Sequence, residues 1–418
     1  MAQLSDDCFA FGGPLLSVED VERLMFERVK AVAEVERASL DAAAGRVLAQ
    51  DVIAPIDLPP FDNSAVDGYA VRHADLGPGG ETRLVVADRL TAGRASMRPL
   101  RKGEAIRIFT GAPMPAGADT VFMQEDCRPE GGCVIVPAGL KPGANRRLTG
   151  EDVRAGSVAL PSGRRLGPQH VALAAALGLT ELPVRRRVRV ALFSTGDEIV
   201  EPGSRRPDAA LFDANRRLLA EMLGRLGAET TDLGILADDP QRLKSALGAA
   251  AEDHDLVLTS GGVSTGEADH VRAAIEAVGK LVFWRVAIKP GRPVAMAVIK
   301  GAAFVGVPGN PVAAFVTFVR VVRPLLLRLA GALPDPMIAL PVRAGFSYSK
   351  KKGRREYVRV TLKRGEDGSI EASKYPQDGA GILSSLTESA GLVELDEETT
   401  QVEPGMAVGF LPHAALIG

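Results

Sequence analysis

Three features are scarce in this sequence: cysteine, an excess of charge of either sign, and long apolar runs. Cys8, Cys127 and Cys133 form an odd set without the spacing of a metal site, as expected in a reducing compartment. Lys and Arg (50) nearly balance Asp and Glu (52), which argues against a general nucleic-acid-binding protein. No apolar run approaches the ~18 residues that a membrane helix needs, and Met1–Pro14 lacks a signal-peptide pattern. We therefore expect a cytoplasmic protein that binds neither nucleic acid nor membranes.

The order of strand and helix signals predicts several domains, because 418 residues are too many for one ordinary core. Residues 53–156 contain short β-prone runs between Gly/Pro turns, which predicts a small β domain. A helical pattern precedes it, beginning with the capping pair Ser17 and Asp20, and another follows it from His170 to Leu179. We therefore expect the β domain to be inserted into a helical N-terminal domain, formed by residues 14–52 and 157–184.

The second half of the chain begins with alternating strand and helix signals and ends with strand signals alone. In residues 185–332 the alternation implies βαβ units on a mostly parallel sheet, whose ligands bind at the carboxyl ends of the strands. Residues 333–418 predict a C-terminal β-barrel-like domain, so the expected fold class is multi-domain α/β plus β. Within 185–332, strands are expected at 188–193, 229–233, 256–258 and 304–307, and helices at 215–226, 240–251, 271–278 and 311–329.

The stretch from Asp255 to Asp269 carries the strongest functional signal. Leu256–Leu258 is an apolar run typical of a strand buried on both faces, and a Gly/Ser/Thr loop follows it. The loop ends in Glu267 and Asp269, where a helix is expected to begin. Such a loop offers backbone N–H groups and a positive dipole end to an anion, and the carboxylates then require a divalent cation. The stretch predicts a phosphate-and-metal site at the carboxyl edge of the sheet.

Two other expected strands end in similar loops. Phe193–Glu198 places hydroxyls, a glycine and two acids after the first strand. Gly306–Pro311 follows the fourth strand, and Pro311 suits the first position of a helix. A glycine turn after a strand is usually only a turn, but three polar loops on one sheet edge favour a ligand site.

A basic turn near the sheet is a further candidate. Pro290 and Pro293 stiffen the segment that carries Lys289 and Arg292, and two fixed cations suit an oxyanion. The alternative is a solvated basic turn.

Two loops of the expected β insertion are also candidates. Pro59–Tyr69 concentrates small polar groups in a Pro-flanked loop, although Asx turns of Asp62 or Asn63 would also explain them. Ile108–Pro113 is similar, with Thr110 at a strand end. Both loops serve the α/β site only if domains or subunits bring them across.

The motifs can be matched as a set: Pro60–Val71, Thr110–Pro113, Gly150–Asp152, Ser194–Glu198, Ser260–Ser264, Gly266–Asp269, Lys289–Gly291 and Pro308–Pro311. In order and spacing they resemble the molybdopterin molybdenumtransferases, bacterial relatives of the gephyrin E domain, over nearly the whole chain from about Pro14. The resemblance implies that adenylylated molybdopterin and molybdate are substrates, that Mg²⁺ assists, and that AMP is released. It also implies an elongated homodimer. Its active site would join the α/β and C-terminal domains of one subunit to the β insertion of the other.

Roles for individual residues follow from the resemblance. Asp67, Thr110, Glu198 and Asp269 match family active-site residues, as do either Asp238 or Asp239. Glu198, Asp238 and Asp269 are the expected Mg²⁺ ligands, with Asp269 preferred to Glu267. Lys289 and Arg292 are expected to bind molybdate or the pterin phosphate. The other expected substrate-binding residues are Ser194, Thr195, Gly196, Asp197, Ser260, Gly261, Gly262, Ser264, Pro308 and Pro311.

Three positions depart from the family pattern. Arg292 stands where a lysine is usual, which changes the donor geometry, and Ala313 and Ala380 each stand where a serine is expected. None of these departures removes a candidate catalytic carboxylate.

Three alternatives remain open at this point. The adenylyltransferase that makes the adenylylated substrate shares the α/β domain, and it is also a candidate partner. It would need neither the β insertion nor the C-terminal domain, and its loop usually reads Gly-Gly-Thr-Gly where Gly261-Gly-Val-Ser264 stands here. A non-catalytic scaffold would have no reason to keep Asp67, Glu198 and Asp269. A paralogue that uses tungstate cannot be separated by sequence, because the two oxyanions are nearly isosteric.

Overall fold

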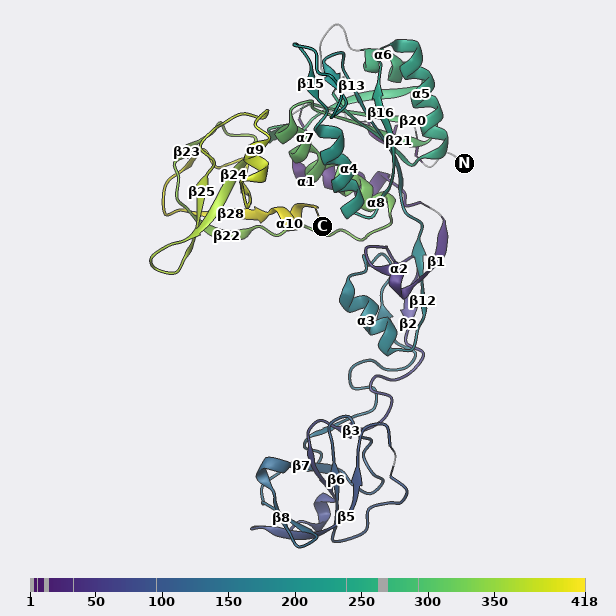
Figure 1. Ribbon diagram of the computed structural model, residues 1–418, viewed down its shortest axis with the longest axis vertical. Coiled ribbons are helices and arrows are strands. Elements are labelled where there is room, and N and C mark those ends of the chain that lie inside the picture. Colours follow the sequence, from purple (N-terminus) through teal and green to yellow (C-terminus); the bar gives the residue numbers. More distant parts are fainter. Residues whose placement is uncertain are drawn as a thin grey trace.

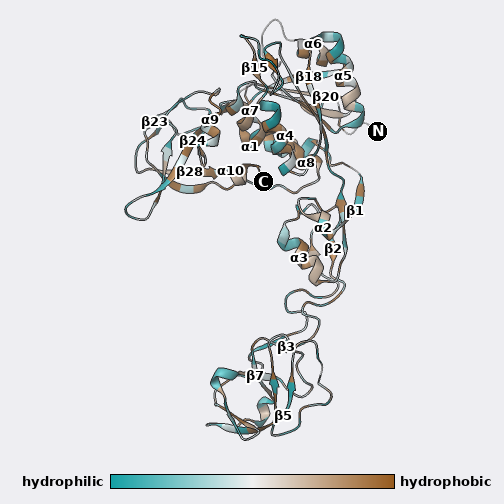
Figure 2. Cartoon of the chain, in the orientation of Figure 1, coloured by the Kyte–Doolittle hydropathy of each residue, from teal (hydrophilic) through white to brown (hydrophobic). Residues whose placement is uncertain are grey.

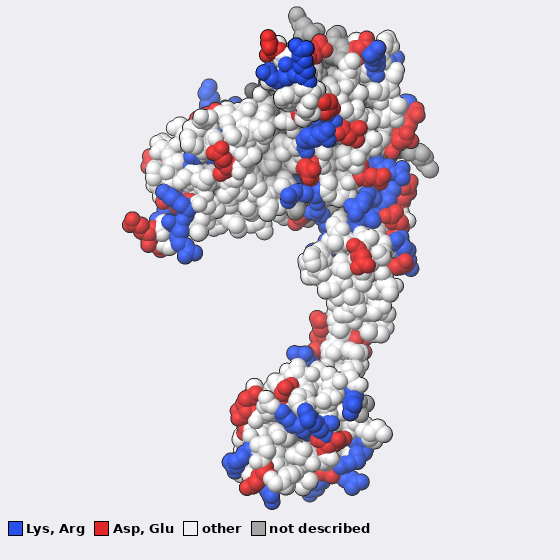
Figure 3. All heavy atoms as spheres, in the orientation of Figure 1, with Lys and Arg blue, Asp and Glu red and all other residues white. Residues whose placement is uncertain are grey.

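The chain forms an elongated molecule with an α/β domain and a C-terminal barrel at one end and a small β domain at the other (Figure 1). The computed structural model describes residues 4–5, 7–10, 15–32, 34–94, 96–237, 239–261, 270–291 and 293–417, without the side chains of His270, Phe283 and Pro293. The two ends are joined by an arm, formed by residues 35–53 and 158–185. On the face seen in Figure 3, charges of both signs are mixed over the two ends, whereas the arm carries few. Among the described residues, no helix is both long and apolar enough to span a membrane.

The α/β domain is built on a sheet of strand order β16-β13-β17-β21-β20-β18. Its four parallel strands are β16 (Glu229–Leu236), β13 (Arg189–Thr195), β17 (Leu256–Ser260) and β21 (Ala302–Val307). Every residue of β17 is buried, as its apolar run predicts. Two strands that the sequence patterns did not indicate complete the sheet in antiparallel orientation, β20 (Pro293–Ile299) and β18 (Gly279–Arg285). The sheet is therefore mostly parallel, as predicted.

Helices cover both faces of this sheet. One face packs against α5 (Pro240–Asp253) and α6 (His270–Glu276), and the other against α4 (Asn215–Arg225) and the run Pro311–Leu329. That run is continuous but contains a π-helical turn, so it divides into α7 (Pro311–Thr317), η3 (Phe318–Val322) and α8 (Arg323–Leu329). Figure 2 shows much of α7 as hydrophobic, which fits its burial between the sheet and its neighbours.

The first helix, α1 (Val18–Arg28), begins with the expected capping box, in which Ser17 and Asp20 exchange side-chain and backbone hydrogen bonds. Val18, Val21 and Met25 join the core of the α/β domain. The helix therefore shares a core with the α/β sheet and not with the second expected helix, α3 (Pro168–Ala176).

The arm has a small core of its own. β1 (Val35–Ser39) pairs with β12 (Glu181–Arg185), and β2 (Val52–Ile53) pairs with β11 (Val158–Leu160). Short α2 (Leu40–Ala43) and α3 pack against these strands. The two chain segments of the arm lead to and from the inserted β domain (Figure 1).

The inserted domain is a sheet of order β7-β4-β6-β5-β9-β8, with a hydrophobic cluster on each side. Its strands are β4 (Gly68–Val71), β5 (Thr82–Leu90), β6 (Glu104–Ile108), β7 (Thr120–Met123), β8 (Arg128–Glu130) and β9 (Cys133–Val136). The short β3 (Asn63–Ser64) and β10 (Arg146–Arg147) pair with each other outside this sheet. The predicted β insertion is confirmed.

The C-terminal domain is a closed barrel. The pairing order β24-β25-β22-β28-β26 returns to β24, so no edge of this ring is left open. Its strands are β22 (Leu340–Ala344), β24 (Arg355–Arg364), β25 (Ile370–Lys374), β26 (Gly391–Leu395) and β28 (Ala407–Pro412). The short β19 (Ile288–Lys289), which follows the α/β strand β18, pairs with β24 and ties the two domains together.

Candidate functional site

A cleft lies at the carboxyl edge of the parallel strands, where sequence patterns placed the ligand site. Its empty volume, counting the part open to solvent, is about 1180 Å³. The walls come from the ends of β13 and β17, the first turns of α4 and α7, and the barrel residues Gly381 and Leu383. The other lining residues are Ser194, Thr195, Glu198, Ile199, Leu211, Phe212, Asp213, Ala214, Asn215, Ser260, Gly261, Gly309, Asn310 and Pro311.

Two residues that line the cleft have buried hydroxyl groups for which the described residues offer no hydrogen-bond partner. Ser194 and Thr195 end β13 and are each only 2% exposed. Neither hydroxyl oxygen finds a hydrogen-bond partner among the described residues. Buried polar groups are almost always hydrogen-bonded, so two unpaired hydroxyls on residues that line the cleft favour a polar ligand.

Asn215 ties three walls of the cleft together. Its Nδ2 donates to Ser260 Oγ over 2.8 Å and to the Gly309 carbonyl over 2.7 Å. It is the first residue of α4, so the start of that helix is fixed to the ends of β17 and of the loop after β21. Sequence reasoning missed this residue, because its partners lie 45 and 94 positions away and leave no local pattern.

Glycines allow the loops to approach one another closely. Gly196 has φ 137°, and a Cβ there would lie 2.7 Å from Glu198 Oε2. Gly261 has φ 86°, and its Cβ would lie 3.0 Å from the Thr195 carbonyl oxygen. A larger residue at either position would therefore strain the backbone and displace a cleft wall.

The first turns of two helices border the cleft. α4 and α7 begin without a side-chain cap, at Ala214 and Asn310 respectively, so N–H groups of both first turns remain available. Two N–H groups are already bonded: that of Arg216 donates to Asp213 Oδ1 over 3.1 Å, and that of Val312 donates to the Ala380 carbonyl over 2.9 Å and joins the barrel to this edge. Two positive helix ends and free N–H groups favour an anion.

A buried ionic network supports the start of α4 from behind. The Arg216 guanidinium donates to Asp213 Oδ2 over 2.8 Å and also contacts Asp232 and Glu201. Arg216 and Asp213 are almost fully buried, at 1% and 3% exposure. The network holds Asp213, which lines the cleft, in a fixed position.

The remaining predicted residues near the cleft differ in their placement. Glu198 lines the cleft, is exposed, and forms no ion pair with a described residue. Asp197 is exposed but is not among the lining residues, and neither is Pro308. Lys289 lies on β19 and donates to Glu356 Oε2 over 3.0 Å, so a buried carboxylate already partly neutralises it.

Arg359 lies on β24, the strand that also carries the Lys289 partner Glu356. It is a cation that the sequence patterns did not indicate. It is 8% exposed and donates to the carbonyls of Gln377 and Gly379, each over 3.2 Å. Its Nε has no partner among the described residues. It fixes the barrel loop that leads to Gly381 in the cleft wall.

Asp67 and Thr110 lie together, but in the inserted domain. Asp67 Oδ1 accepts from the Thr110 N–H and from the Thr110 hydroxyl, each over 2.8 Å. These hydrogen bonds, that from the backbone N–H first, lower the pKa of the Asp67 carboxyl. Within one chain the inserted domain and the cleft occupy opposite ends of the molecule (Figure 1). The structure therefore does not bring Asp67 to Glu198 within one chain.

Five predicted site residues lie outside the described residues: Asp238, Gly262, Ser264, Asp269 and Arg292. Glu267, the alternative to Asp269, lies outside them as well. Among the residues that are described, no group of three or more His, Cys, Asp or Glu side chains is placed to hold a metal ion.

Comparisons with known proteins match the whole length of the chain. Three family models match in order: the MoeA N-terminal region (domain I and II) at 16–178, a probable molybdopterin binding domain at 191–328, and the MoeA C-terminal region (domain IV) at 341–413. The molybdopterin molybdenumtransferase of Haemophilus influenzae is 38% identical over 97% of this chain and 100% of its own length. Molybdopterin molybdenumtransferase 2 of Mycobacterium tuberculosis is 36% identical over 93% of this chain and 97% of its own. A solved molybdopterin biosynthesis MoeA protein from Pyrococcus horikoshii OT3 superposes with a TM-score of 0.79, at 29% identity, over 96% of this chain and 100% of that one.

Proposed function

This chain belongs to the MoeA family of molybdopterin molybdenumtransferases, and we propose that it inserts molybdate into adenylylated molybdopterin with release of AMP. It is a transferase of molybdenum cofactor biosynthesis.

One observation carries this proposal: the cleft presents unpartnered groups that suit an anion beside an apolar wall. Ser194, Thr195 and the first turns of α4 and α7 form its polar side. Leu211 and Phe212 form its apolar side, and they are 62% and 46% exposed. A phosphate-bearing pterin adenylate has both kinds of surface, charged phosphates and flat rings.

Mg²⁺ is expected to assist the reaction, and one of its expected ligands, Glu198, is among the described residues. Glu198 offers an exposed carboxylate at the cleft that forms no ion pair with a described residue, and hard oxygen ligands are those that Mg²⁺ prefers. Asp238 and Asp269 would be its other ligands. A bound Mg²⁺ would neutralise charge on the phosphates.

The chain's own groups account for binding and orientation. The hydroxyls of Ser194 and Thr195 donate to phosphate oxygens, and the N–H groups of the two helix starts add further donors. Asn215 keeps the walls at a fixed separation, so these donors are arranged before substrate arrives. The AMP phosphate leaves as an anion, and donors already in place stabilise the charge that develops on it.

We propose a homodimer in which Asp67 and Thr110 of one subunit complete the cleft of the other. Support comes from their position at the far end of the same chain from Glu198. The arm also exposes apolar side chains of a kind that subunit contacts cover, namely Val35 (47%), Ile53 (49%) and Val158 (50%). The location in the cytoplasm and a handover from the adenylyltransferase belong to the same proposal.

The domains present argue against the adenylyltransferase alternative. An adenylyltransferase needs only the α/β domain, whereas this chain has the inserted domain and the barrel, and each is matched by a MoeA region. A scaffold without activity would not need two buried hydroxyls in a cleft that no described residue pairs with. Tungstate in place of molybdate is separated only by measurement.

The test supplies purified protein with adenylylated molybdopterin, Mg²⁺ and either molybdate, tungstate or no oxyanion. We expect AMP release that depends on molybdate and is lost in Glu198→Gln. AMP release at the same rate without any oxyanion would contradict molybdate insertion. Faster release with tungstate would identify a tungstate-using enzyme.

A further inference from the structure

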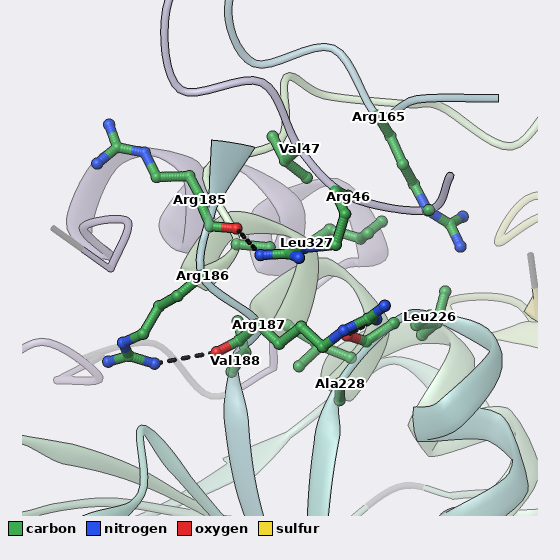
Figure 4. A pocket seen from close by; sticks show the side chains of 14 residues that line it. Arg46, Val47, Arg165, Arg185, Arg186, Arg187, Val188, Leu226, Ala228 and Leu327 are labelled. Carbon is green, nitrogen blue, oxygen red and sulfur yellow. Dashed lines mark hydrogen bonds between the residues drawn. The ribbon is translucent and has the colours of Figure 1, made fainter. Parts of the chain in front are cut away.

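A second cavity lies where the arm meets the α/β domain, and it is lined by five arginines (Figure 4). Its empty volume, counting the part open to solvent, is about 350 Å³. Arg46 and Arg165 belong to the arm, and Arg185–Arg187 lie where it ends. The α/β domain contributes apolar groups and the ends of α4 and α8. We call this space the arginine cavity.

Acidic partners neutralise Arg46 and Arg186. Arg186 binds both carboxylate oxygens of Asp255, over 2.6 and 2.8 Å, and also contacts Glu34. Arg46 is paired with Glu36 and donates to the Arg185 carbonyl over 2.7 Å. Figure 4 shows the side chains of Arg185 and Arg186 directed away from the space that Arg46, Arg165 and Arg187 border.

Arg165 and Arg187 bind only backbone carbonyls. Arg165 donates to the Arg225 carbonyl and Arg187 to the Gly227 carbonyl, each over 2.9 Å. Neither forms an ion pair with a carboxylate in the described part of the chain, and Arg165 Nε is buried without a partner. Each guanidinium has five N–H donors, so most of their donors remain available.

A purely structural reading explains part of this arrangement. Arginines often bind the last carbonyls of a helix, and Arg225 and Gly227 lie at the end of α4. That role uses one N–H of each side chain and offsets little of a full positive charge. Burial lowers the pKa of Arg165, and Asp335, which opposes this shift, is itself paired with Arg323. Arg165 and Arg187 therefore carry positive charge that no described carboxylate pairs with directly, although Asp335 acts on Arg165 from a greater distance.

We propose that the arginine cavity binds one tetrahedral oxyanion between Arg165 and Arg187, with Arg46 at its border. The guanidinium fork matches the oxygens of phosphate, sulfate or a phosphomonoester in two-point contacts. A bound oxyanion balances the two free charges and stiffens the base of the arm. This site is separate from the cleft, and the proposal does not rest on the proposed function.

The first experiment measures sulfate binding by calorimetry at constant ionic strength, with chloride as the reference salt. The parent of every variant carries Ser194→Ala and Thr195→Val, which weakens oxyanion binding in the cleft. In this background we expect Arg165→Gln together with Arg187→Gln to weaken sulfate binding at least about tenfold. Arg217→Gln, on the exposed side of α4, should leave it unchanged. Equal affinity in the double variant and the parent would overturn the proposal.

A second measurement guards against variants that fold poorly. Arg187→Lys alone keeps the charge on an exposed side chain but loses the fork, so it should weaken sulfate binding by a smaller factor. Crystals soaked in selenate should show anomalous signal in the arginine cavity, and signal confined to the cleft would contradict the site. Competition of sulfate by AMP would identify a phosphomonoester as the ligand source, and its absence would identify an inorganic oxyanion.

Discussion

The cleft of the α/β domain and the Asp67 corner of the inserted domain carry opposite kinds of polar group. In the cleft, the Ser194 and Thr195 hydroxyls are buried and have no described partner. At the corner, the Asp67 carboxylate lies near the surface and is already bound twice by Thr110. The cleft therefore presents hydroxyls that suit a ligand, whereas the corner holds one charged group in a fixed position. This difference fits the proposal that the cleft binds substrate and that Asp67 of a neighbouring subunit acts on it.

Removing the fixed carboxylate should have the largest effect. Asp67→Ala should lower the turnover of AMP release by about 10³-fold, the scale of a lost acid–base or positioning group. Its melting temperature should stay close to that of the parent, because the Thr110 groups that it frees can bind water at the surface. Turnover close to that of the parent would remove the corner from the reaction.

The ionic network of Arg216 behind the cleft should contribute to the stability of the fold. Arg216→Met removes the cation paired with buried Asp213 and leaves this carboxylate only the backbone N–H of residue 216 among the contacts described, so the free energy of unfolding should fall by about 3 kcal/mol. Arg217→Met is the matched control, because its side chain is 60% exposed and its ion pairs are 3.4 and 3.7 Å long. Denaturant unfolding should show little change for the control, and similar losses for both variants would refute the network.

Removing the Ser194 and Thr195 hydroxyls should weaken substrate binding without lowering the stability of the fold. Ser194→Ala with Thr195→Val should raise KM about tenfold, since each loses a hydrogen bond to a charged ligand. Stability should not fall, because neither change removes a hydrogen bond to a residue that the structure describes. Thr259→Val is the control, since its hydroxyl is equally buried and unpartnered but does not line the cleft. A rise in KM in the control alone would reverse the assignment.

The smallest effect concerns the pKa of Asp67. Its lowered pKa favours folding at pH above the ordinary aspartate value of about 3.9, and this contribution is lost as pH falls through the lowered value. Thr110→Ala removes the hydroxyl donor but keeps the stronger backbone N–H donor, so the pKa should rise only part of the way to its ordinary value. Carbon-13 NMR titration measures the shift, and an unchanged pKa would show that the hydroxyl contributes nothing.

Much of the fold could be predicted because its signals are local. The capping pair Ser17 and Asp20, the buried run at β17 and the alternation through 185–332 each depend on neighbouring residues. β18 and β20 were not predicted, because β20 pairs with both β18 and β21 and these pairings depend on the completed sheet. Likewise, Glu198 could be named from a strand-end motif, but the contacts of Asn215 span 45 and 94 positions of sequence. Tertiary contacts at that separation leave no periodic pattern.

The most direct test of the shared site mixes two inactive variants, Asp67→Ala and Glu198→Gln, after dissociating and reassociating the subunits. If each site takes Asp67 from one subunit and Glu198 from the other, a mixed dimer has one intact site of its two. Random mixing should then restore about a quarter of parental AMP release, since half of the dimers are mixed. Each variant alone should stay inactive after the same treatment. No recovery, with mixed dimers demonstrated in the sample, would contradict a site shared between subunits.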